Sequence, residues 1–142
     1  MLPEAAEALD AIPGEERARP EVLQLRLNLH MAEKQWALGM ELARHLVTVL
    51  PEDAGSWISL AYCTRRAESV EKAEEILLRA KAAHPEEAMI RYNLACYACV
   101  SGKMDAAIER LKEAITLHEG IRDLAVEDED LRPLWGVVGE MN

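Results

Sequence analysis

The chain has 142 residues, half of them apolar, and its low aromatic content (4%) and lack of phenylalanine favour helices over strands. Length and composition predict one all-α domain with its own core. A net charge of -10 argues against nucleic acid as a partner, because phosphate binding needs clustered Lys and Arg, and no apolar run is long enough for membrane insertion.

Several residues recur at a spacing of 34 positions. The recurring pairs are Pro51 and Pro85, Leu60 and Leu94, Ala61 and Ala95, Ala73 and Ala107, Leu77 and Leu111, and Ala80 and Ala114. A fixed period of this size is typical of a helical-repeat solenoid, in which each repeat is a helix pair that stacks on its neighbours.

Residues 1–19 match only part of this period. Aligning Pro13 with Pro85 places Ala8 under Ala80, so Met1 to Pro13 corresponds to the second half of a repeat. We expect an N-terminal half-repeat or cap over 1–19, with extra residues between positions 14 and 19.

The first full repeat is predicted over 20–53. It keeps the periodic pattern at Leu23, Leu27, Gly39, Ala43, Leu46 and Pro51. Arg26 stands where the pattern has leucine, so this match is weaker than those that follow.

The clearest repeats are predicted over 54–87 and 88–121. Each shows two stretches of apolar residues at helical spacing, separated by a short turn. In the later repeat Arg91 replaces Trp57 of the earlier one, and Gly102 lies in the turn, where a left-handed conformation suits glycine.

Residues 122–142 are predicted to form a C-terminal capping helix. Asp128 or Asp130 would cap it, and Pro133 would be tolerated only near its first turn. Its apolar side chains would cover the exposed end of the last repeat, namely Leu131, Leu134, Trp135 and Val138.

The 54–87 pattern resembles the tetratricopeptide repeat. Seven family signature positions are matched, by Trp57, Leu60, Ala61, Ala73, Leu77, Ala80 and Pro85. The resemblance implies a right-handed superhelical α-solenoid of antiparallel helix pairs. It also implies a non-catalytic scaffold that binds proteins or peptides in a concave groove lined by the first helix of each repeat.

Carried over residue by residue, the family's groove positions give a predicted peptide-binding set. We select Asn28, Ile58, Tyr62, Arg65, Arg66, Met89, Tyr92 and Cys96. The arginines beside Tyr62 would suit a peptide that carries a carboxylate, since guanidinium groups grip carboxylates and Tyr supplies contact area. Alternatively, the arginines end a helix favourably and pair with nearby glutamates.

The family also includes proteins that clamp the C-terminal carboxylate of heat-shock chaperones. Of the residues at the matching positions, only Asn28 fits that clamp. The clamp needs cations to offset desolvation of the bound anion, so we exclude this mode of binding.

Three cysteines are an odd number, which points to reduced thiols in the cytoplasm. Cys96 and Cys99 form a Cys-x-x-Cys pair, with Cys63 one repeat earlier. We favour a packing or groove-lining role, because no histidine lies on the same face; a thiol metal or redox site is the alternative. No phosphate loop, zinc-protease motif or hydrolase elbow is present, so we expect neither an enzyme nor a cofactor.

The sequence therefore predicts a cytoplasmic protein-interaction scaffold. Two alternatives remain open. One is a module that assembles with further copies of itself, through the half-repeat at Met1 to Pro13 or the helix that carries Trp135. The other is a secretion-type chaperone with three repeats.

Overall fold

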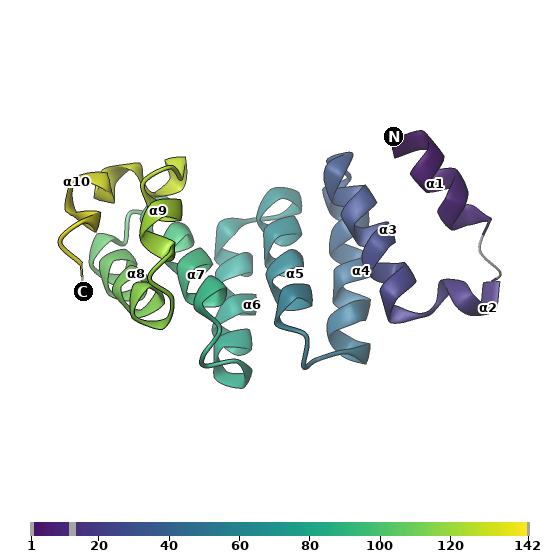
Figure 1. The fold of residues 1–142 in the computed structure, drawn as a ribbon, viewed down its shortest axis with the longest axis horizontal. Helices are drawn as coiled ribbons and strands as arrows, with labels where there is room; N and C mark the ends of the chain where they lie inside the picture. Colours follow the sequence, from purple (N-terminus) through teal and green to yellow (C-terminus); the bar gives the residue numbers. More distant parts are fainter. Residues whose placement is uncertain (1, 12–13, 142) are drawn as a thin grey trace. The chain divides into compact units, whose positions relative to one another are not determined.

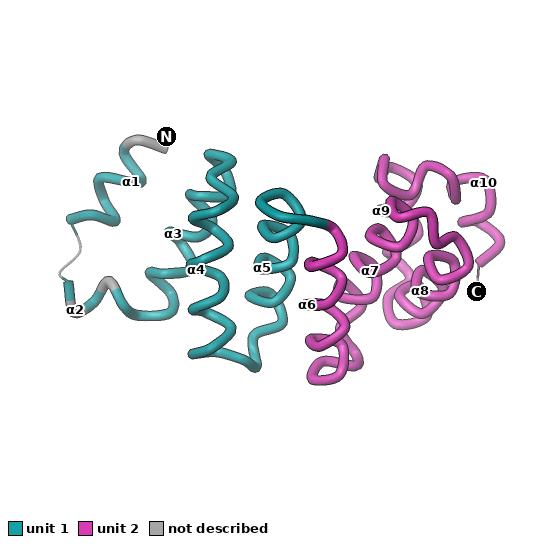
Figure 2. Tube along the Cα trace, turned by 180° about the vertical axis from the view of Figure 1, so that it is seen from behind, with its two compact units in different colours: residues 1–69 teal, residues 70–142 magenta. Residues whose placement is uncertain are grey.

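The computed structural model describes residues 2–11 and 14–141, and this part of the chain contains helices and no strand (Figure 1). Met1 and Pro13, which bound the expected half-repeat, lie outside it. The residues group into two compact units, 1–69 and 70–142 (Figure 2). No described helix combines the length and the apolar character that crossing a bilayer requires.

The first unit contains five helices among the described residues. They are α1 (Leu2–Asp10), α2 (Gly14–Arg17), α3 (Pro20–Ala32), α4 (Trp36–Val49) and α5 (Ala54–Ala67). Helix α1 packs on α3, α3 pairs with α4, and α4 packs on α5. An ion pair between Arg26 Nη2 and Asp10 Oδ1, 3.1 Å apart, links α3 to the end of α1.

The second unit contains α6 (Val70–Ala83), α7 (Ala88–Val100), α8 (Met104–Leu117), α9 (Ile121–Ala125), the 3-10 helix η1 (Glu129–Leu134) and α10 (Trp135–Val138). Helix α7 is its centre, with α6, α8 and η1 packed around it. Residues from Leu94 to Cys99 are all buried, as expected of a helix that is apolar on every side.

The C-terminal segment differs from the single capping helix that the sequence predicted. It forms α9, η1 and α10 instead, and Pro133 lies inside η1. Proline has no backbone N–H and clashes with the preceding turn of an α-helix, which explains why a continuous helix does not form. Of the four predicted covering residues, Leu131, Leu134 and Val138 are nevertheless buried, and Trp135 is half-buried.

The leucine and alanine positions that recur every 34 residues lie in the core. The recurring alanines Ala61, Ala73, Ala80, Ala95, Ala107 and Ala114 are all fully buried. This confirms an all-α fold of stacked antiparallel helix pairs.

A hydrogen bond also recurs with the period, although its donor changes. Trp57 Nε1 donates to the Pro51 carbonyl at 2.9 Å. One repeat later, Arg91 Nη2 donates to the Pro85 carbonyl at 2.6 Å. Arginine therefore replaces tryptophan here without loss of the contact that joins the start of one repeat to the end of the preceding one.

Gly39 allows α4 to lie close to α5. A Cβ atom added at Gly39 would lie 2.9 Å from Cys63 Sγ, in a site where both residues are buried. We predict that Gly39→Ala lowers the free energy of unfolding by roughly 1 kcal/mol, because overpacking costs about 1–3 kcal/mol and the better helix propensity of alanine returns about 1.

Urea denaturation would measure this cost. In a Cys63→Ala background the clash is absent, so the same Gly39→Ala change should be neutral or stabilising. An equal cost in both backgrounds would contradict the proposed contact.

Glu74 links α6 to α8 inside the second unit. Its carboxylate lies 2.8 Å from Arg110 Nη1 and 3.2 Å from Lys103 Nζ. Burial acts to raise the pKa of Glu74, but the hydrogen bonds and charges of Arg110 and Lys103 outweigh burial, and the net pKa is lowered.

A lowered pKa in the folded state means that Glu74 stabilises the fold above its unfolded-state pKa, and that this contribution is lost as pH falls through the folded-state pKa. We predict that Glu74→Gln costs about 1–3 kcal/mol at neutral pH and progressively less below about pH 4.5. Denaturation at several pH values tests this, with the exposed neighbour Glu75 changed to Gln as the control. A cost that does not vary with pH would contradict the assignment.

Candidate functional site

The predicted peptide-binding residues fall into both units. In the first unit Asn28, Tyr62 and Arg66 are exposed, whereas Ile58 and Arg65 are half-buried. Arg65 and Arg66 lie in the last turn of α5. Of these five residues, the structure brings Tyr62 and Arg66 together in one pocket.

This pocket, which we call the α4–α5 pocket, has a volume of about 620 Å³. Its walls come from the end of α3, the α3–α4 turn, the start of α4, and α5. The lining residues are Met31, Ala32, Lys34, Trp36, Tyr62 and Arg66. The volume lies in the range of small-ligand pockets and suits one or two side chains of an extended peptide.

Two aromatic rings and one guanidinium group form the core of the pocket. The ring centroids of Trp36 and Tyr62 are 5.6 Å apart in an edge-to-face arrangement. The Arg66 guanidinium carbon lies 3.6 Å from the Tyr62 centroid and 5.2 Å from that of Trp36. Cation–π attraction therefore holds the arginine in a defined orientation.

The α3–α4 turn places Lys34 at the pocket in an unusual backbone conformation. Its φ is 59°, in the left-handed region. The Gln35 amide donates to the His30 carbonyl and the Lys34 amide to that of Met31, which is the Schellman pattern of a helix C-terminus. The α7–α8 turn has the same pattern with Gly102, φ 79°, at the equivalent position.

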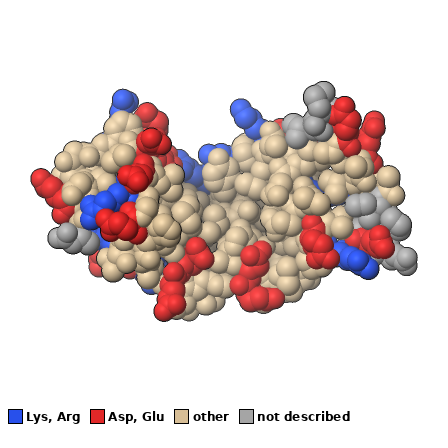
Figure 3. All heavy atoms as spheres, viewed as in Figure 1, with Lys and Arg blue, Asp and Glu red and all other residues tan. Residues whose placement is uncertain are grey.

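The two cations of this pocket, Lys34 and Arg66, have no carboxylate partner within the described residues, unlike several other cations of the chain. Arg26, Arg91 and Arg110 each contact a carboxylate, at 3.1, 2.6 and 2.8 Å. Lys34 and Arg66 are exposed and form no such ion pair in the described part of the chain. Figure 3 shows acidic side chains scattered over the visible face of both units.

In the second unit the structure corrects the expectation that Tyr92 and Cys96 line an open groove. They are only 3% and 2% exposed, because η1 packs against α7. Tyr92 Oη donates to Asp128 Oδ2 at 2.6 Å, and Cys96 Sγ lies 3.7 Å from the same oxygen. The chain's own C-terminal segment thus covers this face of α7.

Met89, the remaining predicted residue, lines a smaller cavity of about 260 Å³ beside the α8–α9 turn. Ile121 and Leu124 contribute apolar surface to the same cavity. Met89 and the α4–α5 pocket belong to different units, so the predicted set does not form one described site.

Cys96, Asp128 and Asp130 bring potential ligand atoms within 4.8 Å of one another. Burial and the nearby negative charges of Asp128 and Asp130 raise the pKa of the Cys96 thiol, which disfavours the thiolate that binds metals. The Asp128 carboxylate already accepts hydrogen bonds from Tyr92 Oη and from the Asp130 amide at 3.0 Å. We therefore assign this cluster to holding η1 on α7.

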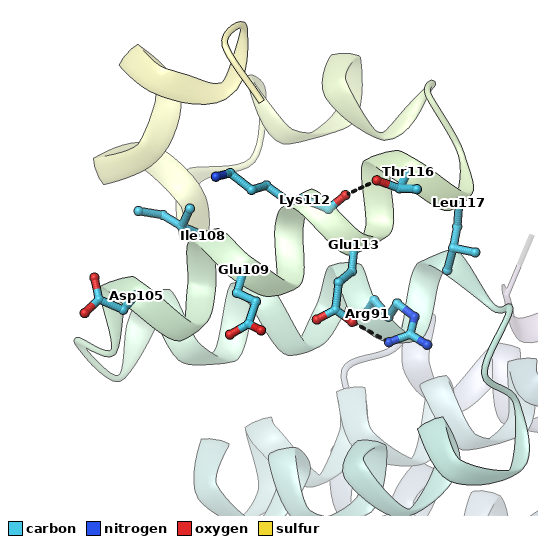
Figure 4. A pocket seen from close by; sticks show the side chains of 8 residues that line it. All are labelled: Arg91, Asp105, Ile108, Glu109, Lys112, Glu113, Thr116 and Leu117. Atoms are coloured by element: carbon cyan, nitrogen blue, oxygen red, sulfur yellow. Dashed lines mark hydrogen bonds and ion pairs between the residues drawn. The ribbon is translucent and has the colours of Figure 1, made fainter. Parts of the chain in front are cut away.

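A further concavity of about 590 Å³ follows the outer side of α8 (Figure 4). Its lining residues are Arg91, Asp105, Ile108, Glu109, Lys112, Glu113, Thr116 and Leu117. Arg91 Nη1 lies 2.6 Å from Glu113 Oε2, and Lys81 Nζ lies 3.8 Å from the same oxygen. The charges at its centre, those of Arg91 and Glu113, are thus already paired with one another.

Four lining residues lie outside the predicted set. Met31 and Ala32 occupy groove positions of the family on the first helix that were not selected. Lys34 lies in the turn and Trp36 is the first residue of the second helix, so neither is at a first-helix groove position. The signal was present in the alignment, because Lys34 precedes Gly102 by two periods. A lysine at a position that favours glycine marks a departure from the repeat.

The Tyr92–Asp128 hydrogen bond predicts the reactivity of a buried thiol. Loss of a hydrogen bond to a charged group costs about 1.5–3 kcal/mol, so Tyr92→Phe should open the C-terminal segment more often and raise the alkylation rate of Cys96 by iodoacetamide about tenfold or more. Mass spectrometry would follow the rate, with buried Cys63 of the first unit as internal control. An unchanged Cys96 rate would show that this bond does not hold the segment.

Neither a protein-family model nor a curated protein sequence matches the chain. Solved structures do. PcrH, in complex with the chaperone binding region of PopB, matches with a TM-score of 0.65 and 17% identity over 93% of this chain and 98% of that one. MamA matches with a TM-score of 0.70 and 18% identity over 99% of this chain and 81% of that one. Both are tetratricopeptide-like helical-repeat proteins, and at these identities the likeness shows the fold.

Proposed function

We propose that the protein is a non-catalytic interaction module that holds a segment of a partner protein in the α4–α5 pocket. The observation that carries this proposal is the cluster of half-buried Trp36 with exposed Tyr62 and Arg66. Trp, Tyr and Arg are the residues most enriched at the energetic centres of protein interfaces. Here they lie on helices, which keep a binding surface rigid.

The structural neighbours support this class of function. The PcrH structure contains a chaperone with the region of PopB that it binds, and its fold covers nearly the whole of this chain. A secretion-type chaperone is therefore the narrower form of our proposal. All three cysteines are buried free thiols, which suits the reducing cytoplasm in which we place the protein.

Assembly with further copies of the chain is the competing proposal. Trp135, which the sequence suggested for such a contact, uses its indole N–H within the second unit instead. It donates to the Ala125 carbonyl at 2.9 Å and to the Asp128 carbonyl at 3.1 Å. This favours a role for Trp135 in holding the C-terminal segment together.

Site-specific photocrosslinking in the native cells tests the proposal. A benzophenone side chain at Ala32, an exposed pocket residue, should give a discrete protein adduct. The same group at Leu117, 40% exposed on α8, is the control and should not give that adduct. Mass spectrometry identifies the partner.

The adduct should disappear in a Trp36→Ala, Tyr62→Ala variant whose helicity is unchanged by circular dichroism. An adduct that persists in this variant, or that forms equally at Leu117, would contradict the assignment of the α4–α5 pocket as the partner-binding site. An adduct of twice the chain's own mass would identify the occupant of the pocket as a second copy of the chain instead of a partner protein.

A further inference from the structure

We infer that the α4–α5 pocket recognises one carboxylate flanked by apolar side chains, on a partner segment that is otherwise neutral or basic. This inference rests on the proposed function and adds the chemistry of the occupant. Arg66 and Lys34 would hold the carboxylate, while Trp36 and Met31 would contact the apolar neighbours.

The Arg66 guanidinium is oriented but still has hydrogen-bond donors available. One face stacks on Tyr62 at 3.6 Å, and Nη1 makes a long hydrogen bond of 3.4 Å to the Tyr62 carbonyl. Its other N–H donors have no acceptor among the described residues. A carboxylate matches these donors in geometry and charge, and stacking limits the entropy lost on binding.

Lys34 adds a second cation at a position where a side chain is unfavourable. A non-glycine residue at φ 59° carries a steric cost that Gly102 avoids in the equivalent turn. Backbone outliers of this kind concentrate at functional sites. Here the outlier is a lysine that lines the same cavity as Arg66. Two cations that share a cavity repel each other, and a bound carboxylate removes that repulsion.

The rest of the protein limits how acidic the partner can be. With a net charge of -10, the chain repels polyanions at long range, although salt confines this field to about 8 Å. The attraction of Lys34 and Arg66 is therefore local. Met31, Ala32 and Trp36 supply apolar surface beside it, which suits aliphatic neighbours of the acidic residue.

A matched pair of peptides tests this specificity. The probes are acetyl-Gly-Leu-Glu-Leu-Gly-amide and its isosteric glutamine counterpart, titrated into nitrogen-15-labelled protein. The reporter is the Trp36 indole N–H signal. The indoles of Trp57 and Trp135 serve as internal references because both donate to backbone carbonyls within the fold.

We expect a saturable shift of the Trp36 signal with the glutamate peptide, at least fivefold weaker binding of the glutamine peptide, and weaker glutamate binding at high salt. The glutamine sequence with a free C-terminal carboxylate forms a third arm. Binding of this third peptide as tight as that of the glutamate peptide would assign the site to a chain terminus instead of a side chain.

Variants separate a binding role from a structural one. Arg66→Gln and Lys34→Gly should each lower the affinity for the glutamate peptide at least fivefold, whereas Lys112→Gln, which removes an exposed cation of the second unit, should not. Lys34→Gly should also leave the melting temperature unchanged or raised, because glycine relieves the strained turn. A parallel loss of melting temperature and affinity would overturn the role of Lys34.

The outcomes distinguish this inference from the proposed function. Equal binding of the glutamate and glutamine peptides would contradict the inference that the pocket recognises a carboxylate, but it would not contradict the proposal that the pocket binds a partner. Absence of a Trp36 shift with all three peptides would also contradict recognition of a carboxylate. The crosslinking experiment at Ala32 would then test the proposed function independently.

Discussion

The close approach of neighbouring helices is the constraint on which this structure depends. The distance between packed helices depends on the side chains at their contact, and the recurring alanines, which are small, are all fully buried. Gly39 marks its limit, since even one added methyl group would meet Cys63 Sγ. Positions that maintain helix spacing are thus unavailable for function, and binding chemistry is confined to helix faces and turns that point outward.

Within that constraint, the repeats preserve backbone contacts while their side chains diverge. Trp57 and Arg91 reach equivalent proline carbonyls, although one is aromatic and the other cationic. Lys34 and Gly102 end equivalent helices with the same hydrogen-bond pattern. The contact needs only an N–H donor and these two turns only a positive φ, so the side chain can differ between the repeats that share them.

The sequence predicted the parts of the structure that follow the period. The spacing indicated the helix pairs, and the family alignment selected Tyr62 and Arg66, which do meet in one pocket. The sequence-based prediction failed where the chain departs from the 34-residue repeat. Trp36 lies outside the first-helix positions, and the burial of Tyr92 depends on how a segment 36 residues further on folds back over α7. No local pattern encodes that long-range contact.

The covered face of α7 and the exposed face of α5 occupy equivalent positions in the repeat, so the two can be compared. In the 34-residue register Cys96 is the counterpart of Tyr62, and at Cys96 the second unit holds a carboxylate, that of Asp128, followed by buried Leu131 and Leu134. The α7 face at Cys96 therefore packs against a segment in which an acidic residue is followed by apolar residues. The counterpart face in the first unit presents Tyr62, and two cations line its pocket, which is the charge that the proposed carboxylate would require. The same scaffold position is thus covered by the chain's own segment in one unit and exposed in the other.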